Sequence, residues 1–123
     1  MPRFEVASIM TSVETGGRAE QAAAAFLADE GYDVLEMNYR RPHCEIDIVA
    51  RFDNTIYFVE VKYRATDKNG AGLDYIDARK LQHMQRAAET WVRERRWNDE
   101  YVLAAIEVSG QEFTVDTFID VMD

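Results

Sequence analysis

Two acidic residues and a lysine lie close together in a stretch that is typical of a strand hairpin. Glu60 and Lys62 are two residues apart, so their side chains point to the same face of an extended strand. With a turn centred on residues 53–54, Asp47 lies opposite Glu60, and Glu45 lies opposite Lys62. Opposed side chains are about 5 Å apart at Cβ, and two carboxylates at that spacing raise each other's pKa. A strand pair built only for packing avoids this arrangement, so these residues are candidates for chemistry.

A divalent cation would relieve the repulsion between the two carboxylates. Mg²⁺ binds oxygen ligands at about 2.1 Å and usually takes one or two carboxylates together with water and substrate phosphate. Asp47, Glu60 and the backbone carbonyl of Val61 would form part of such a shell for Mg²⁺ or Mn²⁺. Lys62 would lie beside the ion and stabilise charge on a phosphate or orient the attacking water. We expect metal-assisted hydrolysis of phosphodiester bonds, with Glu20 as a further carboxylate if the first helix packs over the hairpin.

An ordinary solvated strand face is the alternative interpretation of the Glu60 and Lys62 pair. Taken alone, such a pair is more often a surface feature than a site, since charged side chains are usually exposed. The apolar residues of this strand instead indicate burial on both of its faces: Ile56, Phe58, Val59 and Val61. Together with the opposed Asp47, these apolar flanks keep both interpretations open.

Hydrophobic periodicity predicts the elements that position these residues. Alanine-rich spacing indicates a helix over residues 13–30, and Gly31 suits a left-handed cap at its end. A second helix, capped by Asp74 or Asp77, runs to about Arg96. The order helix, three strands, helix, two strands predicts an α/β domain with a mixed sheet and helices packed on it. The expected strands are residues 32–39, 45–51, 55–63, 101–108 and 113–121, the last at an edge.

The two faces of the second predicted helix differ in composition. Its expected core stripe comprises Leu81, Met84, Ala88, Trp91 and Val92. Arg79, Arg86 and Arg93 recur every seven residues and share a face away from that stripe. The arginine face fits a surface that follows a phosphate backbone, and it equally fits a solvated face balanced by glutamates.

Length and composition favour a single intracellular domain. A chain of 123 residues fits one domain, 1–123, with residues 1–12 as a loose N-terminal arm and residues 65–73 as a flexible loop. A hydrophobic content of 47% excludes a disordered chain. No apolar run approaches the roughly 20 residues of a membrane span, and the N-terminus lacks a signal pattern, so we expect a cytoplasmic protein. Cys44 is the single cysteine, which excludes an intramolecular disulfide.

The net charge of −9 argues against non-specific binding of nucleic acid. Its distribution is uneven, since residues 1–37 hold two basic and seven acidic side chains, and residues 97–123 hold seven acidic and no basic ones. Residues 38–96 hold twelve basic and nine acidic side chains, and this local excess is where a polyanion can dock. The candidate nucleic-acid-binding residues are Arg40, Arg41, Arg64, Arg79 and Lys80.

The hairpin resembles the signature of a known family. Residues Glu45–Ala50 and Tyr57–Arg64 are similar to the YraN-like family of small bacterial proteins, which belongs to the restriction-endonuclease-like, PD-(D/E)xK nuclease superfamily. The similarity covers about residues 16–96. Further matching segments are Gly16–Glu20, Gly31–Leu35, Asn38–Arg40 and, more weakly, Lys80 with the helix after it. Ala19 and Cys44 stand where the family usually has glycine.

The resemblance implies a restriction-endonuclease-like (tRNA endonuclease-like) α/β fold and a Mg²⁺-dependent nuclease. It implies Asp47 and Glu60 as metal ligands, Lys62 as the catalytic lysine and Glu20 as an auxiliary helical acid. DNA is the implied substrate, with RNA as a second expectation, and branched DNA, a homodimer and a role in repair or recombination follow by analogy with resolvases. The alternative is a catalytically inactive module of the same fold that binds nucleic acid or a protein partner, which the acidic charge and the two replaced glycines favour.

Overall fold

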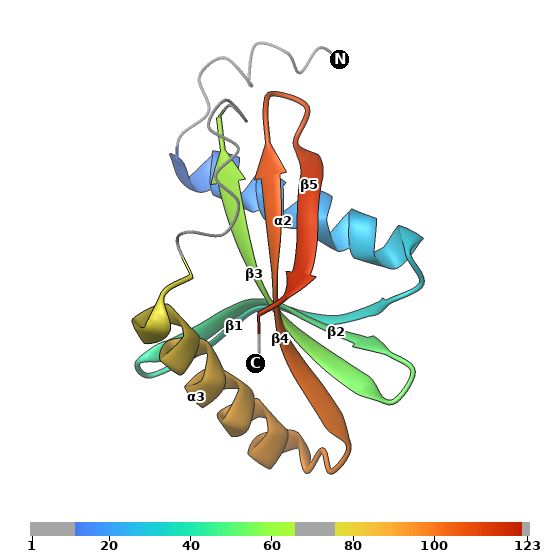
Figure 1. The fold of residues 1–123 in the computed structure, drawn as a ribbon, viewed down its shortest axis with the longest axis vertical. Helices are drawn as coiled ribbons and strands as arrows, with labels where there is room; N and C mark the ends of the chain where they lie inside the picture. The colour runs from blue at the N-terminus through green and yellow to red at the C-terminus, as the bar shows by residue number, and fades with distance from the viewer. Residues whose placement is uncertain (1–11, 66–75, 122–123) are drawn as a thin grey trace.

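The computed structural model describes residues 12–65 and 76–121, which form a helix, three strands, a second helix and two further strands (Figure 1). The helices are α2 (Ser12–Asp29) and α3 (Ala78–Arg95). The strands are β1 (Asp33–Arg41), β2 (Cys44–Phe52), β3 (Thr55–Arg64), β4 (Glu100–Ser109) and β5 (Thr114–Asp120). The predicted element order is confirmed. The predicted arm over residues 1–12 lies outside the described residues except for Ser12, and so does the predicted loop over residues 65–73 beyond Ala65.

The strands form one mixed sheet in the order β1-β2-β3-β4-β5, with β5 at an edge as predicted. All neighbours are antiparallel except β3 and β4, which are parallel. Parallel neighbours need a long crossover connection, and α3 lies within that connection. The crossover therefore brings the start of α3 back to the sheet near the end of β3, where the candidate residues lie.

The two helices cover opposite faces of the twisted sheet (Figure 1). Small residues at four-residue spacing, Ala19 and Ala23, place α2 close against one face. Met84, Ala88 and Trp91 of the predicted stripe are buried under α3 on the other face, while Leu81 and Val92 are half-buried. In the part of the chain described, neither helix is long and apolar enough to cross a membrane.

The alternation of faces in β2 breaks at Asp47. Ile48 packs with residues of α2, whereas Ile46 packs with residues of α3. Asn38 lies on β1 between the partners of these two isoleucines and has a φ of 55°, in the left-handed region. Strict alternation of side chains would place the two isoleucines on one face, but the β1–β2 pair turns over at this point.

Of the two turns that connect the first three strands, one lies where it was predicted and the other begins later. The turn at residues 53–54 lies where it was predicted, and Asp53 adopts a φ of 58° there. β1 continues to Arg41, two residues beyond the predicted strand, because residues 42–43 alone form the next turn. His43 adopts a φ of 67° and reverses the chain, so the two preceding arginines belong to the strand.

Candidate functional site

The candidate site begins where β2 and β3 separate. Their antiparallel pairing runs from the turn at residues 53–54 to the Ile48–Val59 pair, which is the predicted register. Asp47 and Glu60 are the next residues along this register, and the ladder ends before them. The register therefore places Asp47 next to Glu60, at the point where β2 and β3 stop pairing.

The Asp47 side chain bonds to the backbone of β3 at this point. Its Oδ2 accepts a hydrogen bond of 2.7 Å from the backbone N–H of Val61. This N–H belongs to the part of β3 beyond the ladder with β2, so the carboxylate satisfies a main-chain donor that a strand would otherwise satisfy. Asp47 is only 8% exposed, and its position is therefore tied to the backbone of β3.

The surroundings of Asp47 disfavour its ionised form. Burial and the neighbouring charge of Glu60 raise the pKa of Asp47 to about 7, although the Val61 N–H works in the other direction. Glu20 on α2 and Glu45 on β2 raise the Asp47 pKa further. Three carboxylates, on α2, β2 and β3, are therefore close enough to raise the pKa of Asp47.

Glu60 forms an ion pair with a lysine of α3. The Nζ of Lys80 lies 2.9 Å from Oε2 of Glu60, whose side chain is 13% exposed. Asp77, one of the two predicted caps, accepts a hydrogen bond from the Lys80 backbone N–H and fixes the first turn of α3 beside the sheet. Burial lowers the pKa of Lys80, but Glu60, with Asp47 and Glu45, outweighs it and raises the pKa above its usual value.

Lys80 is the residue whose position sequence reasoning missed. It was expected among the nucleic-acid-binding residues, and the structure places its ammonium on one of the two candidate carboxylates. The only available signal was its place in the first turn of a helix that follows the Glu60 strand. The length of the crossover gave no basis for choosing Lys80 over its neighbours.

Lys62 is exposed and lies on the same strand face as Glu60. Phe58, two residues before Glu60, packs with α3, so alternation places Glu60 and Lys62 on the α3 side of β3. On the neighbouring strand β4, the residue in register with Lys62 is Glu107. Glu107 is 5% exposed and forms an ion pair with Arg64. Sequence reasoning missed this buried carboxylate, although a lone acid inside an apolar strand pattern was a usable signal.

Glu45 does not lie opposite Lys62, so this expectation is wrong. The β2–β3 ladder ends before it reaches that position. Glu45 instead pairs with Arg40 of β1, with 3.4 Å between Oε1 and Nε, and both side chains are mostly exposed. β2 stays paired with β1 up to Cys44, whereas its pairing with β3 ends at Ile48.

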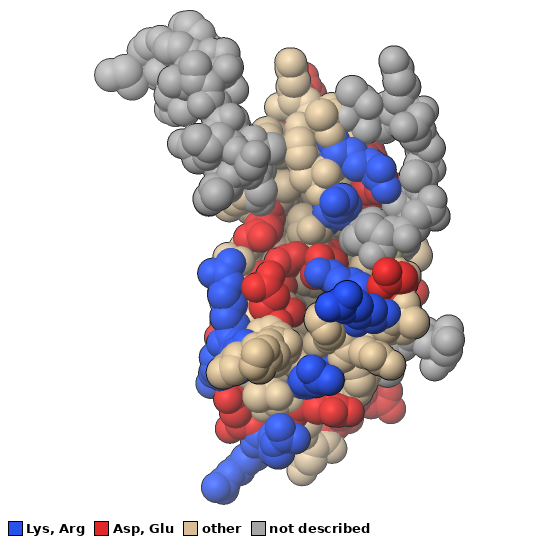
Figure 2. Space-filling model, turned by 90° about the vertical axis from the view of Figure 1, so that its left-hand side faces the viewer, with Lys and Arg blue, Asp and Glu red and all other residues tan. Residues whose placement is uncertain are grey.

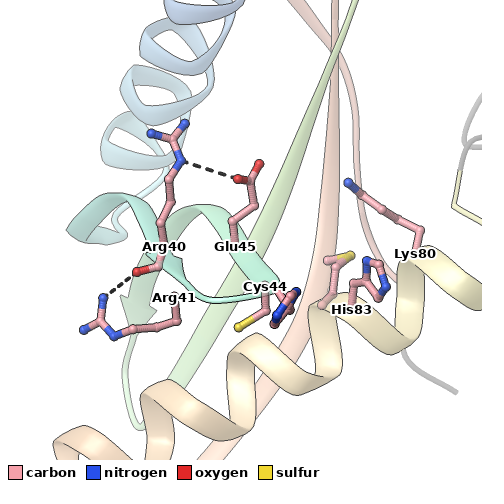
Figure 3. Close-up of a pocket in the computed structure, with 8 residues that line it drawn as sticks. Arg40, Arg41, Cys44, Glu45, Lys80 and His83 are labelled. Carbon is pink, nitrogen blue, oxygen red and sulfur yellow. Dashed lines mark hydrogen bonds and ion pairs between the residues drawn. The ribbon is translucent and has the colours of Figure 1, made fainter.

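A cavity of about 470 Å³ lies next to Lys80, between the β1–β2 turn and α3 (Figure 3). The polar residues that line it include Arg40, Arg41, His43, Glu45, Lys80 and His83. Figure 3 shows Lys80 extending from α3 towards the side of the cavity that carries Glu45. Three of the five predicted basic residues therefore meet at one cavity, while Arg64 lies with Glu107 and Arg79 is exposed on α3.

The face formed by the β1–β2 turn and the start of α3 carries both signs of charge. Figure 2 shows acidic groups gathered at the middle of this face, with basic groups on either side. Within residues 12–65 and 76–121, no group of three or more His, Cys, Asp and Glu side chains is arranged to hold a metal ion. Asp47 and Glu60 together supply two carboxylates, which matches the one or two that Mg²⁺ usually takes.

These features define a small α/β protein with two carboxylates meeting at a strand separation. The chain belongs to the uncharacterised protein family UPF0102, whose sequence profile matches residues 19–120, and its resemblance to the YraN-like family is confirmed. A UPF0102 protein of Cytophaga hutchinsonii is 32% identical over 106 residues, which cover 86% of this chain and 94% of the relative. Relatives of the same name occur in Caldicellulosiruptor saccharolyticus, with 39% identity over 80% of this chain and 85% of the relative, and in Moorella thermoacetica, with 43% identity over 70% and 72%.

Proposed function

We propose that this protein is a divalent-cation-dependent nuclease with a restriction-endonuclease-like fold that hydrolyses phosphodiester bonds in DNA. The observation that carries the proposal is the meeting of Asp47 and Glu60 where β2 and β3 separate. Two acids on adjacent strands supply the hard oxygen donors that Mg²⁺ prefers. The α/β fold with a five-stranded mixed sheet is compatible with this class.

The donor set fits Mg²⁺ or Mn²⁺. Asp47 is buried beside another carboxylate, an arrangement that costs stability unless a proton or a cation offsets the charge. Lys80 already brings a positive group to Glu60, so a cation is accommodated at this position. Asp47 and Glu60 would hold the metal ion, and the ion would supply positive charge beside the phosphate under attack.

The other residues of the site have separate roles in this proposal. Lys62, exposed on the face of Glu60, binds the phosphate or orients the attacking water. Glu20 strengthens the negative field at Asp47 from α2. Arg40 and Arg41, at the adjacent cavity, provide positive charge for the DNA backbone. A homodimer would present two such sites to the two strands of a duplex.

A cleavage panel tests the proposal. Single-stranded, duplex and branched DNA and single-stranded RNA are incubated with the protein and millimolar Mg²⁺ or Mn²⁺. Asp47→Asn and Lys62→Ala should each reduce cleavage by about 10²- to 10³-fold. Asp53→Asn makes the same chemical change as Asp47→Asn at an exposed turn of the same hairpin, and it should keep full activity. Equal activity in the wild type and both site variants would mean that a contaminant cuts the DNA.

A non-catalytic module is the second candidate, and one contact favours it. The ion pair between Lys80 and Glu60 satisfies Glu60 without a metal ion, as in a site that holds its shape and performs no chemistry. The net charge of −9 also favours a partner other than bulk DNA. Specific binding of branched DNA without cleavage, unchanged in Lys62→Ala, would support this function over the nuclease.

A further inference from the structure

Lys80 lies between two neighbouring features of the molecule. On one side its ammonium is 2.9 Å from Oε2 of Glu60. On the other side the same residue lines the cavity between the β1–β2 turn and α3 (Figure 3). Its side chain is 35% exposed, and a lysine has four flexible methylene groups, so the ammonium can move between the two without moving α3.

The cavity has the size and composition of a site for a phosphate-bearing ligand. Its volume of about 470 Å³ falls within the range of about 300–1,000 Å³ that small-ligand sites occupy. Arg40, His43 and His83 contribute groups that donate hydrogen bonds to anions. The guanidinium of Arg41 already makes two bonds to Glu94, of 2.8 and 2.9 Å, and supports the wall of the cavity.

The positive charges at the cavity are incompletely available to a ligand while Lys80 binds Glu60. Arg40 is held by Glu45 at 3.4 Å, and Lys80 by Glu60 at 2.9 Å. A divalent cation on Asp47 and Glu60 would compete with the ammonium for the Glu60 carboxylate. Two cations cannot share one small carboxylate site without strong repulsion, so occupancy by the metal ion favours release of Lys80.

We propose that Lys80 is an exchangeable counter-ion, which neutralises Glu60 when no divalent cation is bound and binds a phosphate group in the cavity when one is. The inference rests on the proposed function, because it needs a metal ion at Asp47 and Glu60. It adds a regulatory consequence, since metal binding and phosphate binding become coupled through one side chain. Coupling of this kind is reciprocal, so a phosphate-bearing ligand also strengthens the binding of the metal ion.

Metal affinity tests the first half of the proposal. Mn²⁺ is titrated by calorimetry into the wild type, Lys80→Met and Arg79→Met. Lys80→Met should bind Mn²⁺ about three- to tenfold more tightly, because the competing ammonium is gone. Arg79→Met removes a positive charge from the same turn of α3 at an exposed position, and its affinity should stay within about twofold of the wild type. Equal affinities in the two variants would overturn the proposal.

The position of the ammonium can be followed in the wild type, whatever the variants do. Mg²⁺ is added to protein labelled at the lysine ¹³Cε and ¹⁵Nζ atoms, and the Lys80 signal is assigned by its absence in Lys80→Met or Lys80→Gln. Release from Glu60 should shift this signal in proportion to Mg²⁺ occupancy. A Lys80 signal that stays constant while Mg²⁺ binds would overturn the proposal without relying on a folded variant.

Phosphate binding tests the second half. The affinity for thymidine 5′-monophosphate is measured with saturating Mg²⁺ and with a chelator, in the wild type and in Lys80→Met. Direct contact between the ion and the phosphate contributes equally in both proteins, so the difference between the two gains isolates Lys80. The gain should be about tenfold larger in the wild type, and equal gains would overturn the proposal.

The outcomes separate this inference from the proposed function. Mn²⁺ binding with the same affinity in all three proteins leaves the metal site in place and removes the role of Lys80. No binding of Mn²⁺ to any of them removes both, because the site at Asp47 and Glu60 would then not take a cation.

Discussion

Two acidic side chains at the boundary between α3 and the sheet lie in opposite electrostatic settings. Glu94 on α3 accepts two hydrogen bonds from Arg41 and one of 2.9 Å from the Tyr39 hydroxyl. The hydrogen bonds from Arg41 hold the pKa of Glu94 below its usual value, against the opposing effect of burial. Asp47 is buried beside other carboxylates, so its pKa rises to about 7 even though the Val61 backbone N–H bonds to it and acts in the opposite direction.

The difference separates a contact that supports the fold from one that works against it. At Glu94, each acceptor oxygen is matched by a donor from β1, which ties α3 to the edge of the sheet. At Asp47, burial and the neighbouring charge of Glu60 disfavour the ionised carboxylate. Substitutions in these two places should therefore change stability in opposite directions.

Asp47→Asn is the sharpest test of the comparison and has the largest expected effect. Cleavage should fall by about 100-fold or more, since a ligand oxygen with full negative charge is lost. The melting temperature at pH 8 should rise, because the amide keeps the acceptor for the Val61 N–H and removes the buried charge. Thermal unfolding in the absence of metal, beside cleavage assays, checks both. A less stable Asp47→Asn protein at pH 8 would break the comparison.

The pH dependence of stability should carry the signature of Asp47. Its pKa is about 7 in the folded protein against 3.8 for the free side chain, so between these values the folded state binds a proton that the unfolded state lacks. Stability should fall as the pH rises from about 4 to about 7, by up to about 1.4 kcal/mol per pH unit from this one group.

Urea unfolding of the wild type and Asp47→Asn across this pH range isolates the effect. The difference between their unfolding free energies should grow in favour of the variant with increasing pH. The Asp53→Asn control should follow the wild type, since this turn residue is exposed. A difference that does not change with pH would remove Asp47 as the cause.

Glu94→Gln should have a smaller effect, in the direction opposite to that of Asp47→Asn. Loss of the charge weakens both bonds from Arg41, and the melting temperature should fall by a few degrees. The fall should diminish in high salt, because the pair is partly exposed and screened. Glu89→Gln, at an exposed position on the same helix, provides the control. A stability gain in Glu94→Gln would contradict the supporting role of this contact.

Tyr39→Phe should have the smallest effect. It removes one hydrogen bond to Glu94 while keeping the buried ring, and a hydrogen bond of this kind contributes about 1 kcal/mol. Chemical denaturation of the variant measures the loss. The effect should vanish in the Glu94→Ala background if the hydroxyl acts only through the Glu94 side chain, because alanine offers no acceptor. A persistent loss would assign the effect to the packing of β1 instead.

The register of the hairpin could be predicted because local chemistry sets it. A turn at residues 53–54 fixes which residues oppose one another, and a shift of one residue would turn every apolar side chain to the wrong face. The approach of Asp47 to Glu60 follows from that register alone. The spacing of the apolar residues likewise predicted the buried stripe of α3.

The partners of these acids could not be predicted in the same way. Lys80 reaches Glu60 through the placement of a whole helix after the crossover, which depends on packing across the sheet and not on spacing. The turnover of β1 and β2 depends on Asn38 in the left-handed region, and an asparagine within a strand pattern gives little warning of it. Glu45 pairs with Arg40 and not with Lys62, the partner that the sequence predicted.

The hydrogen bond that holds Asp47 comes from a main-chain donor, so it tolerates changes of side chain at position 61. Because the N–H of Val61 belongs to the peptide unit, nineteen of the twenty amino acids at that position would still offer it. Only proline lacks this hydrogen, so only proline would remove the donor itself. The anchor of the acid is thus protected against nearly every point substitution in the strand that provides it.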